Sequence, residues 1–206
     1  MLCSTPLLSS FAFTFNMPSA LIKNIACNTA HDLGNPGPDY RFGFGRINAL
    51  AAVKILEQNR YALNTITTGT TNDITITVPA GASRLRVMLT WNDPAAAANS
   101  AFALVNNLDL RVIEGANTTL PWILDPVNPS VPAIKADDNI SNIEQVTINN
   151  PVAGTYTLRV IGEAVATGPN QPYALTWDIN QPYIEVIYPN GTERFNPSSS
   201  EVITWD

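Results

Sequence analysis

The sequence predicts a mainly β protein whose largest part is an antiparallel, jelly-roll-like β-sandwich. Apolar and polar residues alternate with a period of two in a series of segments between residues 64 and 180. Turn sequences with Gly and Pro separate these segments, and 45% of the residues are hydrophobic, which suffices for a packed core. Helical periodicity occurs only before residue 60, where it predicts two short helices ahead of the sandwich.

The first predicted helix covers residues 18–30. Pro18 suits its first turn, because the N–H that proline lacks would be unpaired there. The apolar residues lie at the i, i+1, i+4 and i+5 spacing of one helix face, which we expect to be buried. These residues are Leu21, Ile22, Ile25 and Ala26.

A second helix is predicted over residues 49–58. Asn48 is a suitable N-cap, because its side-chain oxygen can accept a hydrogen bond from an unpaired N–H of the first turn. We expect Leu50 and Val53 to face inward, together with Ile55 or Leu56.

Beyond Tyr61 the hydrophobic period changes from 3.6 to 2. One apolar and one polar face per strand indicates two packed sheets with solvated outer faces. A spacer from Glu114 to Ile143 is rich in Pro, Asn and Asp, and we expect it to hold a short strand near 122–124 and a crossover. The predicted strands cover residues 74–78, 85–91, 108–112, 146–148, 156–160 and 173–177.

Residues 181–206 form a third predicted unit. Ile184, Val186 and Tyr188 alternate before a Pro-Asn-Gly turn, and residues 202–205 begin another strand. Two strands alone do not make a stable unit. We therefore interpret this segment as the start of an incomplete immunoglobulin- or fibronectin-like β domain.

Charge and hydropathy exclude two classes of partner. The net charge is -6 and the pI about 4.7, so the chain gains nothing from counterion release on nucleic acid. No apolar run reaches the ~18 residues that span a bilayer. The first fifteen residues contain an apolar run but no Lys or Arg precedes Lys23, which favours an artificial or truncated start over a signal peptide.

Residues 18–56 resemble the end of a subtilisin-like serine protease domain. The resemblance rests on a PSALIK-type helix, an NTA sequence and the pattern Phe42-Gly43-Phe44-Gly45-Arg46-Ile47-Asn48. Gly43 and Gly45 permit torsions or close approaches that a Cβ would block. Residues 64–180 are similar to the β-sandwich that follows the catalytic domain in some subtilases, through LTWNDP, VNNLDL, NIEQV and GTYTL.

This resemblance implies a division into residues 1–63, the truncated end of a subtilisin-like α/β catalytic domain, residues 64–180, the sandwich, and residues 181–206. It implies a secreted, extracellular serine endopeptidase that acts on proteins or peptides through a catalytic domain outside this sequence. The family's GTSMA-like serine motif is absent, and Ser4, Ser9 and Ser10 lack its flanking residues, so we assign no catalytic residue and expect this chain alone to be inactive.

Two other interpretations remain open. The chain is a stand-alone binding module for a glycan or a cell-surface protein, or it is the non-functional product of a truncated gene. A binding module is expected to bury the face of Leu21, Ile22 and Ile25 completely, whereas a fragment of a larger domain leaves part of it without a partner.

His31 is the sole histidine of the sequence, and Cys27 and Asp32 lie near it. A Cys/His pair or a zinc site is conceivable from this spacing. We favour a polar histidine at a helix C-terminus, where partial positive charge suits the helix dipole. The two cysteines, Cys3 and Cys27, are interpreted as unpaired thiols, although their spacing does not exclude a disulfide.

The acidic residues of the sandwich point to calcium as the candidate cofactor. Ca²⁺ prefers several oxygen ligands from Asp, Asn and backbone carbonyls, and related sandwiches in the resembled family can bind it. Asn107 and Asp109 place two oxygen-bearing side chains on one face of a predicted strand, and they are the candidate ligands. The alternative is that Asp93, Asp109, Asp137, Asp138 and Glu144 are solvated surface acids.

Overall fold

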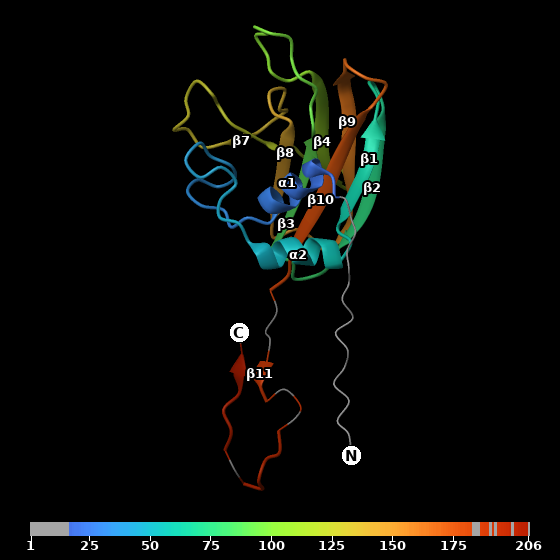
Figure 1. The fold of residues 1–206 in the computed structure, drawn as a ribbon. Helices are drawn as coiled ribbons and strands as arrows, with labels where there is room; N and C mark the ends of the chain where they lie inside the picture. Colours follow the sequence, from blue (N-terminus) through green and yellow to red (C-terminus); the bar gives the residue numbers. More distant parts are fainter. Residues whose placement is uncertain (1–16, 183–185, 190, 192, 199, 206) are drawn as a thin grey trace, which may run out of the picture.

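A computed structural model describes residues 17–182, 186–189, 191, 193–198 and 200–205 (Figure 1). The signal-like stretch, Cys3, the three serines before residue 11 and Ile184 lie outside the described residues. Two helices precede a sandwich of two four-stranded antiparallel sheets, so the mainly β fold class is confirmed.

The first sheet has the strand order β1-β10-β3-β8, and the second has the order β2-β9-β4-β5. Every neighbouring pair is antiparallel. The first sandwich strand lies beside the last one, and consecutive sandwich strands alternate between the sheets except for the β4–β5 hairpin, which is the connectivity of a jelly roll. The bounds of the first sheet are β1 Tyr61–Ile66, β10 Gln171–Asn180, β3 Arg84–Trp91 and β8 Ile143–Asn149. Those of the second are β2 Thr71–Val78, β9 Gly154–Val165, β4 Asn106–Glu114 and β5 Asn117–Thr119.

Two short pairs of strands lie beside the sandwich. β6 (Trp122–Ile123) pairs with β7 (Ile134–Lys135), so the strand predicted in the long spacer is present and has a partner. β11 (Val186–Tyr188) pairs with β12 (Thr204–Trp205), so both strands predicted in the C-terminal segment are present, the second one only over its last two residues.

The core of the sandwich lies between the two sheets. Alternate residues of β3 and β4 point inward, as the period of two predicts, and Trp91 is buried with its Nε1 donating to the carbonyl of Asn106 at 2.9 Å. Burial of so many aliphatic side chains, at roughly 25 cal/mol per Å², is the main stabilising term of the fold. The central core residues include Leu85, Val87, Leu89, Leu108, Leu110, Val146, Leu158 and Leu175.

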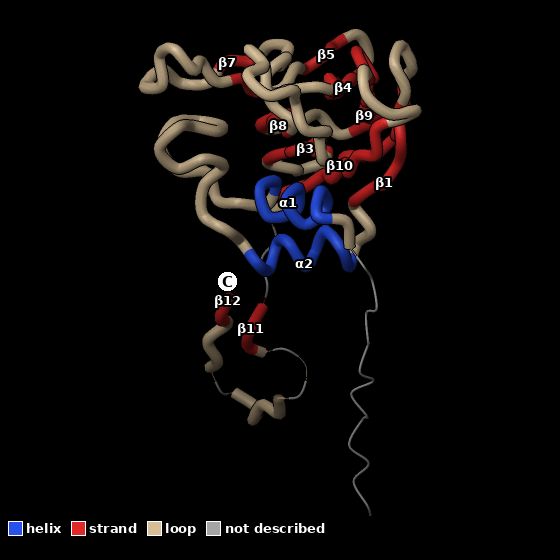
Figure 2. The backbone as a smooth tube through the Cα atoms, turned by 45° about the horizontal axis from the view of Figure 1, so that its top comes forward, coloured by secondary structure: helices blue, strands red, loops and turns tan. Residues whose placement is uncertain are grey.

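The outer face of the first sheet is not solvated, which corrects one expectation. Arg86, Met88 and Thr90 of β3 are buried, because α1 (Ser19–Asn28) lies across β3 and β10 (Figures 1 and 2). The second helix, α2 (Ala49–Glu57), packs against α1 and the end of β10. Asn48 caps it as predicted, accepting from the backbone N–H of Ala51 at 3.0 Å.

Buried amides attach α1 to the sheet. Asn24 is fully buried, and its Nδ2 donates to the carbonyls of Met88 at 2.8 Å and Ala174 at 3.0 Å. Its Oδ1 accepts from the hydroxyl of Thr176. Asn28 is also fully buried and donates to the same hydroxyl at 2.9 Å. Each buried polar group thereby has a partner, so the helix is fixed in one position on the sheet.

Arg86 completes this junction at the C-terminal end of α1. Its guanidinium donates to the carbonyls of Asn28 at 3.1 Å and Ala30 at 2.6 Å. Burial, with repulsion from Arg84 as a smaller cause, lowers the pKa of Arg86 to about 10, so the side chain is still a cation at neutral pH. A cation is favourable beside the last carbonyls of a helix.

The inward faces of the two helices were only partly predicted. Leu21 and Ile25 are buried as expected, but Ile22 is 56% exposed. In α2 the prediction was wrong for Leu50 and Val53, which are 67% and 50% exposed, while Ile55 is buried. The sequence of α2 is apolar around most of its circumference, so its period does not decide which side faces the sheet.

The loop between the helices depends on glycine where the resemblance to subtilases was drawn. Gly43 and Gly45 have φ values of +60° and +104°, which confirms that they adopt torsions unfavourable for other residues. A Cβ on Gly45 would also meet the carbonyl oxygen of His31. Close approach there lets His31 and Arg46 exchange two backbone hydrogen bonds of 2.7 and 2.9 Å.

Candidate functional site

The candidate calcium ligands lie on β4, near the edge where the two sheets approach each other. Asn107 donates through Nδ2 to Oδ1 of Asn139 at 2.7 Å, which brings the long spacer over the strand. Asp109 is 6% exposed and pairs with Arg111, whose Nη2 lies 3.2 Å from its Oδ2. The same Nη2 lies 2.5 Å from Oδ1 of Asp137 in the spacer.

A third acidic side chain reaches this edge from the opposite sheet. Glu144 of β8 is fully buried, and its Oε2 accepts from the backbone N–H of Leu110 at 2.7 Å. This bond connects β8 with β4 across the open side of the sandwich. Burial raises the pKa of Glu144 well above its ordinary value of 4.5, and the charges of Asp109 and Asp138 raise it further.

Two further acidic residues, Asp138 and Asp109, affect the electrostatics of the cluster. Asp138 is 6% exposed and its Oδ1 accepts from the backbone N–H groups of Ile140 and Ser141, at 2.8 and 3.0 Å. The pKa of Asp109 is raised, first by burial and then by the charges of Asp137 and Glu163, against the lowering effect of Arg111. Neighbouring carboxylates thus add to the effect of burial in raising the pKa of Asp109 and of Glu144, close to a single arginine.

Three buried oxygen atoms of this cluster have no hydrogen-bond partner among the described residues. They are Asn107 Oδ1, Asp109 Oδ1 and Glu144 Oε1. An unsatisfied buried acceptor costs about 1–3 kcal/mol, so a group of them is unusual in a folded protein. Amide and carboxylate oxygens of this kind are the ligands that Ca²⁺ prefers.

Carboxylates alone do not form this site. Within the described part of the chain, no group of three His, Cys, Asp or Glu side chains is arranged to hold a metal ion. Any ion at this edge would therefore depend on the amide oxygen of Asn107 and on backbone carbonyls or water in addition to the two acids. Sequence reasoning named Glu144 among the acids but did not select it as a ligand. Its place on the apolar phase of β8, with Val146, is the signal that distinguishes it.

The remaining acid named from the sequence has a structural role. Asp93 accepts from the backbone N–H groups of Val105 and Asn106, at 2.7 and 2.8 Å, and so closes the loop before β4. It lies outside the cluster, because its carboxylate is occupied by this loop.

His31 is an exposed residue beyond the end of α1, and its Nε2 lies 3.1 Å from Nδ2 of Asn48. Asp32 accepts from the N–H of Gly37 at 2.8 Å, and Cys27 is a half-buried thiol whose pKa is raised by burial. The hydrogen bonds of His31 and Asp32 thus stabilise the loop and do not orient a nucleophile. The structure gives the Cys/His pair no support.

Comparisons with known proteins relate the sandwich to peptidases. The family described as bacterial pre-peptidase C-terminal domain matches residues 70–162, less than half of the chain.

No helix in the described residues is long and apolar enough to cross a membrane.

Two curated proteins of Dictyostelium discoideum are similar to the chain. The serine protease/ABC transporter B family protein tagA is 25% identical over 174 residues, which cover 78% of this chain and 10% of that protein. The related protein tagB is 31% identical over 90 residues, which cover 43% of this chain and 5% of that protein. The chain thus spans a tenth or less of the length of these relatives. Together with the family match, these similarities fit a C-terminal domain of a protease.

Among solved structures, a periplasmic inhibitor of g-type lysozyme from Aeromonas hydrophila is similar, and the alignment covers 58% of this chain and 84% of the inhibitor chain. The sequence identity is 17% and the TM-score 0.32, a similarity too low to carry an argument.

Proposed function

We propose that this chain is the C-terminal part of a secreted, subtilisin-like serine endopeptidase, and that its sandwich is an accessory domain that stabilises the catalytic domain. The parent enzyme would hydrolyse peptide bonds of protein substrates through a serine nucleophile and a histidine base. The chain alone would be inactive, because its sequence contains no subtilase serine motif.

The exposed side of the two helices is the observation that carries this proposal. Leu21 and Ile25 are buried, whereas Ile22, Ile47, Leu50 and Val53 are 50–70% exposed. Helices that close a larger α/β domain would bury such residues against the rest of that domain. Residues 1–63 would then belong to the catalytic domain, with residues 64–180 docked on it through the amides of α1.

A stand-alone binding module for a glycan or cell-surface protein accounts less well for these residues. It would bury the whole face of Leu21, Ile22 and Ile25, and it gives no reason for the exposure of Ile22. The truncated-gene alternative predicts no activity in any longer product.

The transcript upstream of the Met1 codon tests the proposal. We expect an in-frame or frame-shifted stretch that encodes a GTSMA-like motif before Pro18. An unrelated upstream sequence would instead favour the binding module. Because the test reads nucleic acid, it does not depend on the folding of any variant.

We also propose that the cluster of Asn107, Asp109 and Glu144 binds Ca²⁺. Its support is the set of three buried oxygen atoms without partners, at an edge where Glu144 joins the two sheets. The ion would neutralise the two acids and fix the spacer over β4, so its contribution would be to stability. It would supply no chemistry to peptide hydrolysis.

A further inference from the structure

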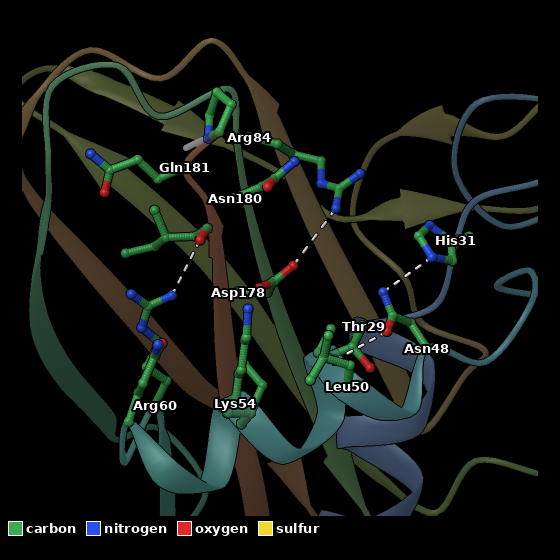
Figure 3. Close-up of a pocket in the computed structure, with 15 residues that line it drawn as sticks. Thr29, His31, Asn48, Leu50, Lys54, Arg60, Arg84, Asp178, Asn180 and Gln181 are labelled. Atoms are coloured by element: carbon green, nitrogen blue, oxygen red, sulfur yellow. Dashed lines mark hydrogen bonds and ion pairs between the residues drawn. The ribbon is translucent and has the colours of Figure 1, made fainter. Parts of the chain in front are cut away.

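A pocket of about 460 Å³ lies between α2 and the ends of β3 and β10 (Figure 3). Lys54 lines it from α2, Arg60 follows that helix, Arg84 begins β3, and Asp178 lies on β10. Amide side chains of Asn180 and others complete the wall. The pocket is separate from the calcium cluster, whose residues do not line it.

The charge in this pocket is opposite to that of the whole chain. Three cationic side chains and a single carboxylate line it. The chain as a whole has only 11 Lys and Arg and a net charge of -6. Cations gathered in a cleft attract counter-ions more strongly than scattered surface charges do.

The two guanidinium groups have donor capacity left for a ligand. Arg84 Nη2 lies 3.7 Å from Asp178 Oδ2, which is a loose ion pair, and the Arg84 side chain is 30% exposed. Arg60 donates from Nη1 to the carbonyl of Ile179 at 3.2 Å. Since each guanidinium has five N–H donors, one carboxylate and one carbonyl satisfy only part of them.

The arrangement of these groups indicates the shape of the ligand. Arg60 and Arg84 lie on opposite sides of Asp178, and both extend along the pocket wall (Figure 3). A ligand with two separated negative groups would meet both guanidinium forks, whereas a compact anion would meet one. Arginine binds planar carboxylates with two parallel hydrogen bonds.

We propose that this pocket binds a dicarboxylate, either a free small dicarboxylate or two acidic side chains of a peptide segment. The two sources share one chemistry, a pair of carboxylates held by Arg60 and Arg84 on either side of Asp178. This site does not depend on the protease assignment, because every residue that forms it belongs to this chain.

Isothermal titration calorimetry of the 206-residue chain at constant ionic strength tests the proposal. The probes are glutarate, the dipeptide N-acetyl-Glu-Glu-amide, and sulfate as a compact anion. We expect saturable binding of glutarate or the dipeptide and clearly weaker binding of sulfate. Tighter binding of the dipeptide would identify a protein segment as the source, and tighter binding of glutarate a small molecule.

Three variants and one control separate this site from general charge effects. Arg60→Gln and Arg84→Gln should each weaken dicarboxylate binding about tenfold, because each removes a charge-assisted pair of bonds. Asp178→Asn should strengthen binding severalfold, a change that loss of folding cannot produce. Arg159→Gln is the control, because Arg159 pairs with Asp73 on the other sheet.

Two results would overturn the proposal. One is the absence of saturable binding of both dicarboxylate probes to the wild-type chain. The other is equal binding of sulfate and glutarate with equal loss in Arg159→Gln, which would show non-specific attraction to positive charge.

Discussion

Replacing Glu144 by Gln should raise stability without calcium and weaken the stabilisation that calcium gives. Glu144 is fully buried, its Oε1 lacks a partner, and Asp109 and Asp138 oppose its ionisation. Without calcium, at a pH where Glu144 is ionised, the neutral amide removes a buried charge, and this should raise the stability by about 1–3 kcal/mol. For a domain of this size that corresponds to an increase in Tm of about 2–4 °C per kcal/mol.

With calcium the advantage of the variant should shrink or disappear. An ion held at one hundred times its Kd stabilises the wild type by about 2.7 kcal/mol. The Gln variant replaces a charged ligand by an amide and should lose most of this increase. We would measure Tm by differential scanning calorimetry in EGTA and in excess CaCl₂, with Glu114→Gln, a hairpin residue that contacts Asn117, as the matched control.

The pH dependence of the stability tests the role of Glu144 independently. A carboxyl whose folded pKa is raised binds its proton more tightly in the folded state. In the calcium-free wild type, its stabilising contribution is complete below the ordinary pKa of 4.5 and is lost as the pH rises toward the raised value. Glu144→Gln should lack this fall. Equal calcium-induced shifts in Tm for the wild type and the variant would refute the assignment of Glu144 as a ligand.

Two further substitutions test the packing of the helices and the loop. Asn24→Ala removes the hydrogen bonds to two buried carbonyls and the acceptor of the Thr176 hydroxyl, and it should lower the free energy of unfolding by about 2–4 kcal/mol in urea denaturation. The exposed neighbour Lys23→Ala should change it little, and equal effects of the two substitutions would contradict a role for the amide junction. Gly45→Ala should lower the free energy of unfolding by more than about 2 kcal/mol, because the new Cβ would meet the carbonyl oxygen of His31. Its control, Gly43→Ala, should lower it by only about 1 kcal/mol in the same assay, because the space around Gly43 is open.

The sandwich strands were predictable because their period of two is set by local burial. Residues such as Leu85, Val87 and Leu89 alternate with polar neighbours, and the structure places them in the core. The same pattern gave a wrong prediction for Arg86 and Thr90, which were expected to face solvent. Polar residues on the opposite phase suggest solvent, but here a helix from distant sequence covers them.

The amides of α1 and the orientation of α2 were beyond sequence reasoning for related reasons. Asn24 and Asn28 look like surface residues in sequence, and only the approach of β3 and β10 gives them buried partners. Leu50 and Val53 are apolar, but which side of a nearly all-apolar helix packs inward depends on its tertiary neighbours.

Only part of the proposed calcium cluster could be predicted from the sequence. Asn107 and Asp109 share a strand, so their spacing shows them together. Glu144 joins them from the opposite sheet, 34 residues from its backbone partner Leu110. No local sequence pattern predicts a contact between residues so far apart in the chain. An acidic residue on the apolar phase of a strand is nevertheless a signal that can be sought in other sequences.

Labelling with a fluorophosphonate that reacts with activated serines tests the central assignment most directly. The 206-residue chain and the longest product of its gene would be treated in parallel, and the bound probe quantified by intact-protein mass spectrometry. The account predicts one probe per molecule on the longer product and none on the chain. Stoichiometric labelling of the chain itself, or no labelling of a correctly folded longer product, would contradict it.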